Sequence, residues 1–199
     1  MPIRRSKNPV EVAFVIVGLG NPGAEYEHTR HNAGADAVVE LASRRGAALK
    51  AEKGVAATMA TVGFGDQRVV LAVPTTYMNE SGVAVRDLLG RYEVADDAHV
   101  VLVHDELDLE PGEVRVKLGG GLAGHNGLRS TAKLIGTQDF ARVRIGVGKP
   151  RRPEQGADHV LSRPRGADRD AYDTGVQAAA DALERIIASG VDAAMNATN

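Results

Sequence analysis

The stretch that decides the fold is VAFVIVGLGNPG, residues 12–23. Its first half, Val12–Val17, is an unbroken apolar run rich in β-branched residues, which predicts a buried strand. Its second half is a Gly/Pro loop. Apolar residues at helical spacing then run from Ala33 to Arg45 and stop at Gly46, which predicts a helix. A buried strand, a loop and a helix in this order are typical of an α/β domain.

The same alternation continues along the chain. Further strands are predicted at 55–62, 69–73, 100–103, 113–118 and 142–147, the first two as a hairpin, with helices at 83–92, 127–135 and 169–188. Residues 149–166, rich in Pro, Arg and Gly, are predicted to form a surface loop. We therefore expect one α/β domain over residues 12–199, with a central, twisted, mixed but mostly parallel sheet flanked by helices. Residues 1–11 are expected to form a flexible N-terminal arm.

Length and composition restrict the class of protein. The 199 residues suit one domain, and 43% of them are hydrophobic, as in an ordinary globular protein. The chain has no cysteine, which excludes disulfides, thiolate nucleophiles and cysteine-based zinc sites and suits a reducing cytoplasm. The apolar run at Val12–Val17 is too short for a signal peptide or a membrane span, so we expect a cytoplasmic protein with no membrane partner.

The charge is unevenly distributed, although the net charge is only −2. Residues 111–165 hold 11 Lys and Arg against 4 Asp and Glu, a net of +7, whereas the remaining residues hold 13 against 22, a net of −9. Such asymmetry within one domain favours a basic face for a polyanion. A solvated basic surface without a partner is the alternative at this point.

The loop Gly18-Leu19-Gly20-Asn21-Pro22-Gly23 also matches the dinucleotide pattern G-x-G-x-x-G, so an NAD-binding Rossmann domain is an alternative. Two features count against it. That pattern should open a helix, whereas Pro22-Gly23 and the residues after them indicate an extended loop. An acidic residue is also expected at the end of a second strand, about 20 residues on, but Glu40 falls inside the first predicted helix.

Four polar segments follow predicted strands, where ligands bind in α/β sheets. They are 29–34 with His31, 74–82 with Met78 and Asn79, 104–108 with Asp105, and 117–127 with Asn126. Histidine is the side chain best suited to moving protons near neutral pH, and a carboxylate can fix its tautomer. Taken singly, each segment could instead be a helix cap or a surface loop, as His28 is expected to be.

Motifs for several other chemistries do not occur in the sequence. There is no D-x-D-x-D-G calcium loop, no H-E-x-x-H zinc motif and no GK[ST] ending of a phosphate loop. The G-x-S-x-G motif of a serine nucleophile is also missing. Because cysteine is absent as well, a water activated directly by a general base is the simplest hydrolytic chemistry.

Five segments together resemble the bacterial peptidyl-tRNA hydrolase family: VGLGNPGAEYEHTRHNAG, VPTTYMNESG, VHDELDLEPG, KLGGGLAGHNGL and FARVRIGVGKP. They span most of the chain from about residue 14 to 150 and occur in the family's order. The resemblance implies hydrolysis of the ester that joins a peptide to the 3′-terminal ribose of a tRNA, which recycles tRNA from stalled or aborted translation. A catalytically inactive RNA-binding module on the same fold is the alternative.

The resemblance also implies roles for individual residues. His31 matches the catalytic base and Asp105 the carboxylate that orients it. The positions that match the substrate-binding residues are Asn21, Tyr26, Met78, Asn79 and Asn126. Lys117 and Arg144 match the basic pair that binds the 5′ phosphate and acceptor stem of the tRNA, and both lie in the +7 segment. The family implies no metal, no cofactor and no obligate protein partner. It implies a monomer that binds peptidyl-tRNA, including its CCA end.

Overall fold

The computed structural model describes residue 6 and residues 8–150 and 152–199. Within these residues, seven strands form the main sheet in the order β3-β4-β5-β2-β7-β9-β8. The strands are β2 (Phe14–Gly18), β3 (Lys50–Ala51), β4 (Ala57–Phe64), β5 (Gln67–Pro74), β7 (Val100–Glu106), β8 (Val114–Leu118) and β9 (Ala141–Gly146). The neighbours β5, β2, β7 and β9 are parallel, whereas β4 and β8 run antiparallel to their neighbours. The mixed, mostly parallel sheet is confirmed.

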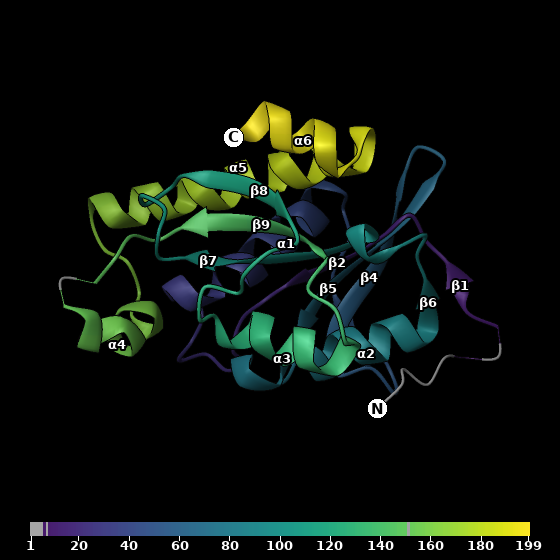
Figure 1. The fold of residues 1–199 in the computed structure, drawn as a ribbon, viewed down its shortest axis with the longest axis horizontal. Coiled ribbons are helices and arrows are strands. Elements are labelled where there is room, and N and C mark those ends of the chain that lie inside the picture. Colours follow the sequence, from purple (N-terminus) through teal and green to yellow (C-terminus); the bar gives the residue numbers. More distant parts are fainter. Residues whose placement is uncertain (1–5, 7, 151) are drawn as a thin grey trace.

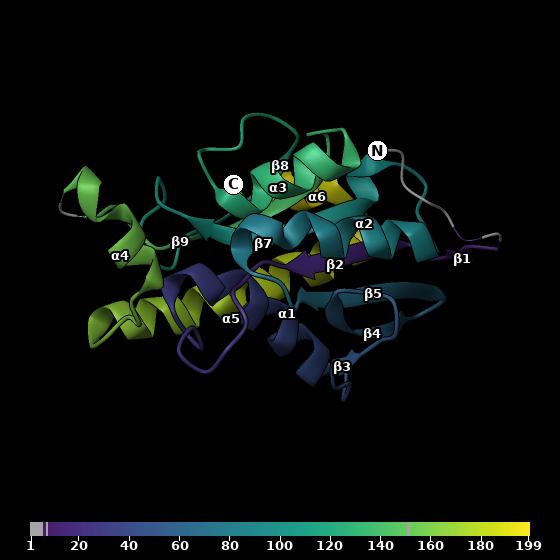
Figure 2. The same ribbon diagram turned by 90° about the horizontal axis from the view of Figure 1, so that it is seen from below.

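Helices cover both faces of this sheet (Figures 1 and 2). One face carries α1 (Ala33–Arg44), α5 (Ala167–Ser189) and α6 (Val191–Thr198), and the other carries α2 (Ser81–Arg91) and α3 (Asn126–Ile135). The short helix α4 (Gly156–Leu161) lies at one end of the molecule, between β9 and α5. No helix among the described residues is both long and apolar enough to cross a membrane.

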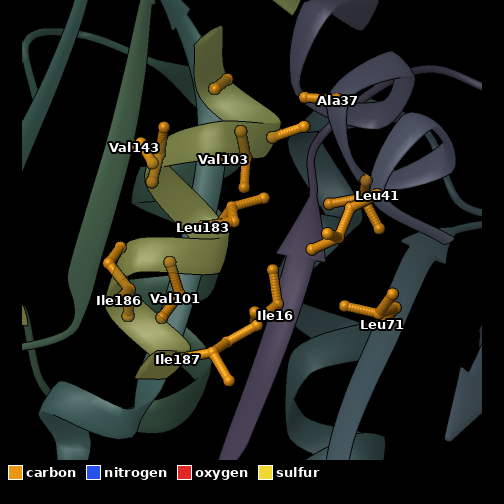
Figure 3. Close-up of a cluster of buried hydrophobic side chains, with 14 of the residues drawn as sticks. Ile16, Ala37, Leu41, Leu71, Val101, Val103, Val143, Leu183, Ile186 and Ile187 are labelled. Atoms are coloured by element: carbon orange, nitrogen blue, oxygen red, sulfur yellow. The ribbon is translucent and has the colours of Figure 1, made fainter. Parts of the chain in front are cut away.

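The larger hydrophobic core lies between the sheet and the helix pair α1 and α5 (Figure 3). Leu183, Ile186 and Ile187 of α5 pack against Val101 of β7 and Ile16 of β2. Because β2 and β7 are covered on both faces, every residue of either strand is buried, which explains the unbroken apolar runs in the sequence.

Two glycines allow the start of α1 to lie directly against the sheet. A Cβ atom on Gly34 would lie 2.0 Å from the carbonyl oxygen of Val103, and one on Gly18 would lie 2.3 Å from the carbonyl oxygen of Gly34. The backbone amide of Leu19 donates to the same Val103 carbonyl at 2.9 Å. This close approach brings the 3₁₀ turn η1 (Arg30–Asn32), which carries His31, to the carboxyl end of β7.

Some sequence predictions were wrong in detail. The segment 149–166 is not only a loop, because it contains the turn η4 (Pro153–Gln155) and helix α4. Most of the predicted arm, 1–11, lies outside the described residues, but its last two residues form strand β1 (Val10–Glu11), which pairs with β6 (Tyr92–Glu93) in a separate two-stranded sheet. The predictions did not include α6.

Candidate active site

His31 and Asp105 meet at the carboxyl end of β7. His31 lies in η1, and Asp105 is the penultimate residue of β7. The Nδ1 atom of His31 lies 2.8 Å from Oδ1 of Asp105. Both residues are buried, with 9% and 4% of their surfaces exposed. Because the carboxylate accepts the hydrogen bond, Nδ1 carries the proton and Nε2 of the neutral ring keeps a lone pair.

Burial and charge act in opposite directions on the pKa of His31 and on that of Asp105. Burial alone would lower the pKa of His31, but the charge of Asp105 and its hydrogen bond outweigh burial and raise that pKa above its ordinary value. Burial alone would raise the pKa of Asp105, whereas His31 and His125 hold it well below its usual range. Asp105 is therefore a carboxylate at neutral pH, and it favours the protonated form of His31.

A second histidine, His125, binds the same carboxylate oxygen. Its Nε2 lies 3.0 Å from Oδ1 of Asp105, and its ring centroid lies 5.0 Å from that of His31. Its Nδ1 accepts hydrogen bonds from the backbone amides of Gly127 and Leu128, so His125 also caps the first turn of α3. His125 was not predicted from the sequence as a site residue, although a polar residue directly before a helix is a usual cap signal.

A third histidine, His104, completes a buried cluster. Its ring centroid lies 4.9 Å from that of His125, and its Nδ1 donates to the backbone carbonyl of Asp105 at 2.7 Å. Burial, reinforced by His125, lowers the pKa of His104 to about 3. His104 is therefore neutral, and its buried Nε2 has no hydrogen-bond partner within the described part of the chain. His104 was not predicted from the sequence as a site residue.

His31, Asp105 and His125 could in principle hold a metal ion, since one ligand atom of each lies within 4.8 Å of the others. The hydrogen bonds of His125 oppose this use. Its Nε2 would have to lose its proton to bind a metal, and the proton would then sit on Nδ1, facing the two backbone amides of Gly127 and Leu128. The arrangement therefore suits proton transfer better than metal binding.

A cavity of about 240 Å³ opens beside these histidines. It is lined by His31, His104, Asp105, Glu106 and Leu107, by residues 123–125 of the glycine-rich loop (residues 119–125, between β8 and α3), by Asn126 at the start of α3, and by Gly156, Ala157 and Val160 of α4. The structure thus brings three of the predicted site residues, His31, Asp105 and Asn126, to one cavity.

The other predicted substrate-binding residues lie in the loops next to α3 and η1. Asn21 accepts a hydrogen bond from the backbone amide of Met78 through its side-chain oxygen at 2.8 Å, so it braces the turn η2 (Met78–Glu80). Met78 is buried, and its sulfur would lie 2.6 Å from a Cβ atom on Gly127. Tyr26 packs edge-on against Tyr77, with 6.3 Å between ring centroids. Asn79 is exposed.

The predicted tRNA-binding residues share one face of the sheet edge. In the antiparallel pair β8–β9, Lys117 lies opposite Arg142 and Arg115 lies opposite Arg144. Residues that face each other, or that lie two apart along a strand, point to the same side of a sheet. Four cationic side chains therefore point to one side of this strand pair, while Val114, Val116, Val143 and Ile145 on the other side join the core under α5 and α6.

These cations differ in what they contact. Arg142 is buried and donates to backbone carbonyls of the glycine-rich loop, including that of Gly120, so it supports the loop. Arg144 is partly exposed and pairs with Glu106, with 3.1 Å between Nε and Oε2. A Cβ atom on Gly120 would lie 3.0 Å from Nζ of Lys117, which places the ammonium beside the loop. Arg142 was not predicted from the sequence as a site residue.

The NAD-binding alternative is not supported by this geometry. No helix opens at Gly20, and residues 19–29 form a loop. The glycines of the motif serve close packing, because Cβ atoms on Gly18 and Gly20 would lie 2.3 Å from the Gly34 carbonyl oxygen and 2.9 Å from the Ala35 Cβ.

Known proteins resemble this chain over most of its length. The family described as peptidyl-tRNA hydrolase matches residues 15–199. The peptidyl-tRNA hydrolase of Mycolicibacterium vanbaalenii is 48% identical over 182 residues, which cover 92% of this chain and 94% of that protein. That of Mycobacterium tuberculosis is 47% identical over 183 residues, which cover 92% and 95%.

A solved structure also resembles this chain over most of its length. The crystal structure of peptidyl-tRNA hydrolase from Acinetobacter baumannii superposes with a TM-score of 0.88 at 38% identity, over 94% of each chain. The segments that carried the resemblance all lie within the matched residues, and the resemblance is confirmed. The chain belongs to the peptidyl-tRNA hydrolase family.

Proposed function

We propose that this chain hydrolyses the ester between a peptide and the 3′-terminal ribose of tRNA, with neutral His31 as the general base for water. The observation that carries this assignment is the buried contact of His31 with Asp105 in the lining of the cavity. The names of its relatives support the substrate. An ester is already activated, so a positioned base and an oxyanion donor are sufficient for its hydrolysis.

The tautomer of His31 suits this role. Asp105 holds the proton on Nδ1, so Nε2 accepts the proton of the attacking water. The imidazolium that forms then lies 2.8 Å from a carboxylate, which stabilises it. General-base catalysis of this kind supplies about 10²–10⁴-fold in rate.

Asparagines are proposed to bind the reacting group and the peptide. Asn126 lines the cavity beside His31, and we assign its amide, or that of Asn79, to the oxyanion, at about 10²-fold or more per donor. We assign Asn21, Tyr26 and Met78 to the binding of the peptide and the terminal adenosine. A peptidyl group carries an amide where a free aminoacyl group carries an ammonium. A site built to hydrogen-bond that amide therefore disfavours free aminoacyl-tRNA.

Lys117 and Arg144 are proposed to bind the 5′ phosphate and acceptor stem of the tRNA. Both lie on the basic face of β8–β9, within the segment of net charge +7. Contacts of this kind position the RNA and make binding dependent on salt. We further propose that the chain works in the cytoplasm as a monomer, without a metal or another cofactor.

The test is the release of N-acetylaminoacyl groups from tRNA by the purified protein, with unblocked aminoacyl-tRNA as the matched control. The expected products are the free N-acetylamino acid and tRNA with an intact 3′ hydroxyl, from the blocked substrate alone. If the protein binds tRNA but releases nothing, it is an RNA-binding module and the enzymatic assignment is wrong.

A further inference from the structure

Asn126 and Arg129 stand one helical turn apart at the start of α3 and contact each other. Residues at this spacing lie on the same face of a helix. The Nη2 group of Arg129 donates a hydrogen bond to Oδ1 of Asn126. Within the described residues, this is the one side-chain hydrogen bond of either residue.

This contact decides which way the Asn126 amide is oriented. A guanidinium group has only donors, so the atom that it contacts must be the amide oxygen and not the nitrogen. The Nδ2 group, on the other side of the amide, then points away from Arg129 and keeps both of its N–H groups for another partner. Asn126 lines the cavity next to His31, so this free Nδ2 group is available to a ligand bound there.

Arg129 itself faces a different cavity. An open groove of about 850 Å³ lies between α3 and the glycine-rich loop, and Arg129 and Lys133 both line it. Asp139 is the carboxylate in its lining. Lys117 lies beside Gly120, another lining residue, so the groove adjoins the proposed phosphate-binding surface.

We infer that Arg129 is a positioning residue: it holds the Asn126 amide with Nδ2 directed at the reacting carbonyl. The inference rests on the proposed function, because it assumes that Asn126 donates to the substrate in the cavity. This role of Arg129 differs from a simple phosphate contact, because it affects the chemical step and not the binding of the substrate. A phosphate contact strengthens binding of substrate and transition state alike, whereas an oriented donor acts mainly on the developing oxyanion.

The test is a double-mutant cycle with N-acetylaminoacyl-tRNA as the substrate, made from Arg129→Met, Asn126→Ala and the double variant. Arg129→Met removes the donor but keeps a long unbranched side chain. We expect it to lower kcat about tenfold in the otherwise wild-type protein, the value of one hydrogen bond to a charged group. In the Asn126→Ala background, the same change should lower kcat less than twofold, because Arg129 then has no amide to orient.

Lys133→Met is the matched control, because it removes a charge from the same groove and lies one turn beyond Arg129. We expect it to raise KM and to leave kcat within twofold. If Arg129→Met changes KM alone, or lowers kcat equally in both backgrounds, the inference is wrong. If the wild-type protein releases nothing, the proposed function itself fails, which is a separate result.

Discussion

Replacing Asp105 with asparagine would remove the charge between two histidines and leave an oxygen that both can still contact. His31 and His125 both approach Oδ1, at 2.8 and 3.0 Å, and an asparagine oxygen can accept from both rings. The new NH₂ group takes the place of Oδ2. Asp105→Asn therefore separates the effect of charge from that of geometry.

The magnitude follows from the distance. At an effective dielectric constant of about 20, two unit charges 2.8 Å apart attract by about 6 kcal/mol. The imidazolium charge is spread over its ring, so we take roughly half of this, about 3 kcal/mol, as the part lost in the transition state. Since about 1.4 kcal/mol corresponds to a factor of ten, kcat should fall about 100-fold.

The pH dependence of kcat/KM independently checks the direction in which Asp105 shifts the pKa of His31. Only neutral His31 can act as the base, so activity is lost as the pH falls through its pKa. The carboxylate raises that pKa above the ordinary value, so the acid limb of the wild-type profile should lie above about pH 6.5. In Asp105→Asn, burial acts without the opposing charge and lowers the pKa of His31, so the acid limb should move to lower pH.

The measurement is the rate of N-acetylaminoacyl release between pH 5 and 9 for wild type and Asp105→Asn. Asp108→Asn is the matched control, because Asp108 is exposed and pairs with Lys149 on the surface. It should behave as wild type. An Asp105→Asn variant with activity within threefold of wild type, or with an acid limb moved to higher pH, would refute the reasoning.

Three further predictions follow from individual contacts. His125→Asn keeps a helix-capping side chain but is too short to reach Asp105, so kcat should fall about tenfold while circular dichroism shows unchanged helix content. Lys117→Ala should raise KM and reduce the slope of log(kcat/KM) against log salt by about one, measured between 50 and 200 mM salt. Gly34→Ala should lower the free energy of unfolding in urea by about 3 kcal/mol or more, because the new methyl group meets the Val103 carbonyl.

The architecture could be predicted well from the sequence where burial leaves a clear apolar pattern. The apolar runs in β2 and β7 are buried on both faces, and both strands lie where they were predicted to within two or three residues. Helix α4 was missed because none of its residues is buried, so no apolar periodicity marks it among Pro, Arg and Gly residues. Strand β1 was missed because it is two residues long and exposed.

The site could be predicted only in part. His31 and Asp105 lie 74 residues apart in sequence, and it was the family resemblance that paired them. His125 and His104 could not be predicted as site residues, because their importance comes from contacts across the fold. His125 contacts Asp105, 20 residues earlier in the chain, because the loop before α3 lies against the end of β7. Likewise, a pattern of residue types could not show that Arg142 is buried under the glycine-rich loop.

The central claim, that His31 is the base, is tested most directly by His31→Ala beside His28→Asn. His28 lies three residues earlier on the exposed surface, and its backbone φ of 58° is one that asparagine tolerates. With N-acetylaminoacyl-tRNA at saturating concentration, His31→Ala should release the acyl group at least about 100-fold more slowly than wild type, and His28→Asn at the wild-type rate. A His31→Ala protein that keeps more than a tenth of the wild-type rate would contradict the account.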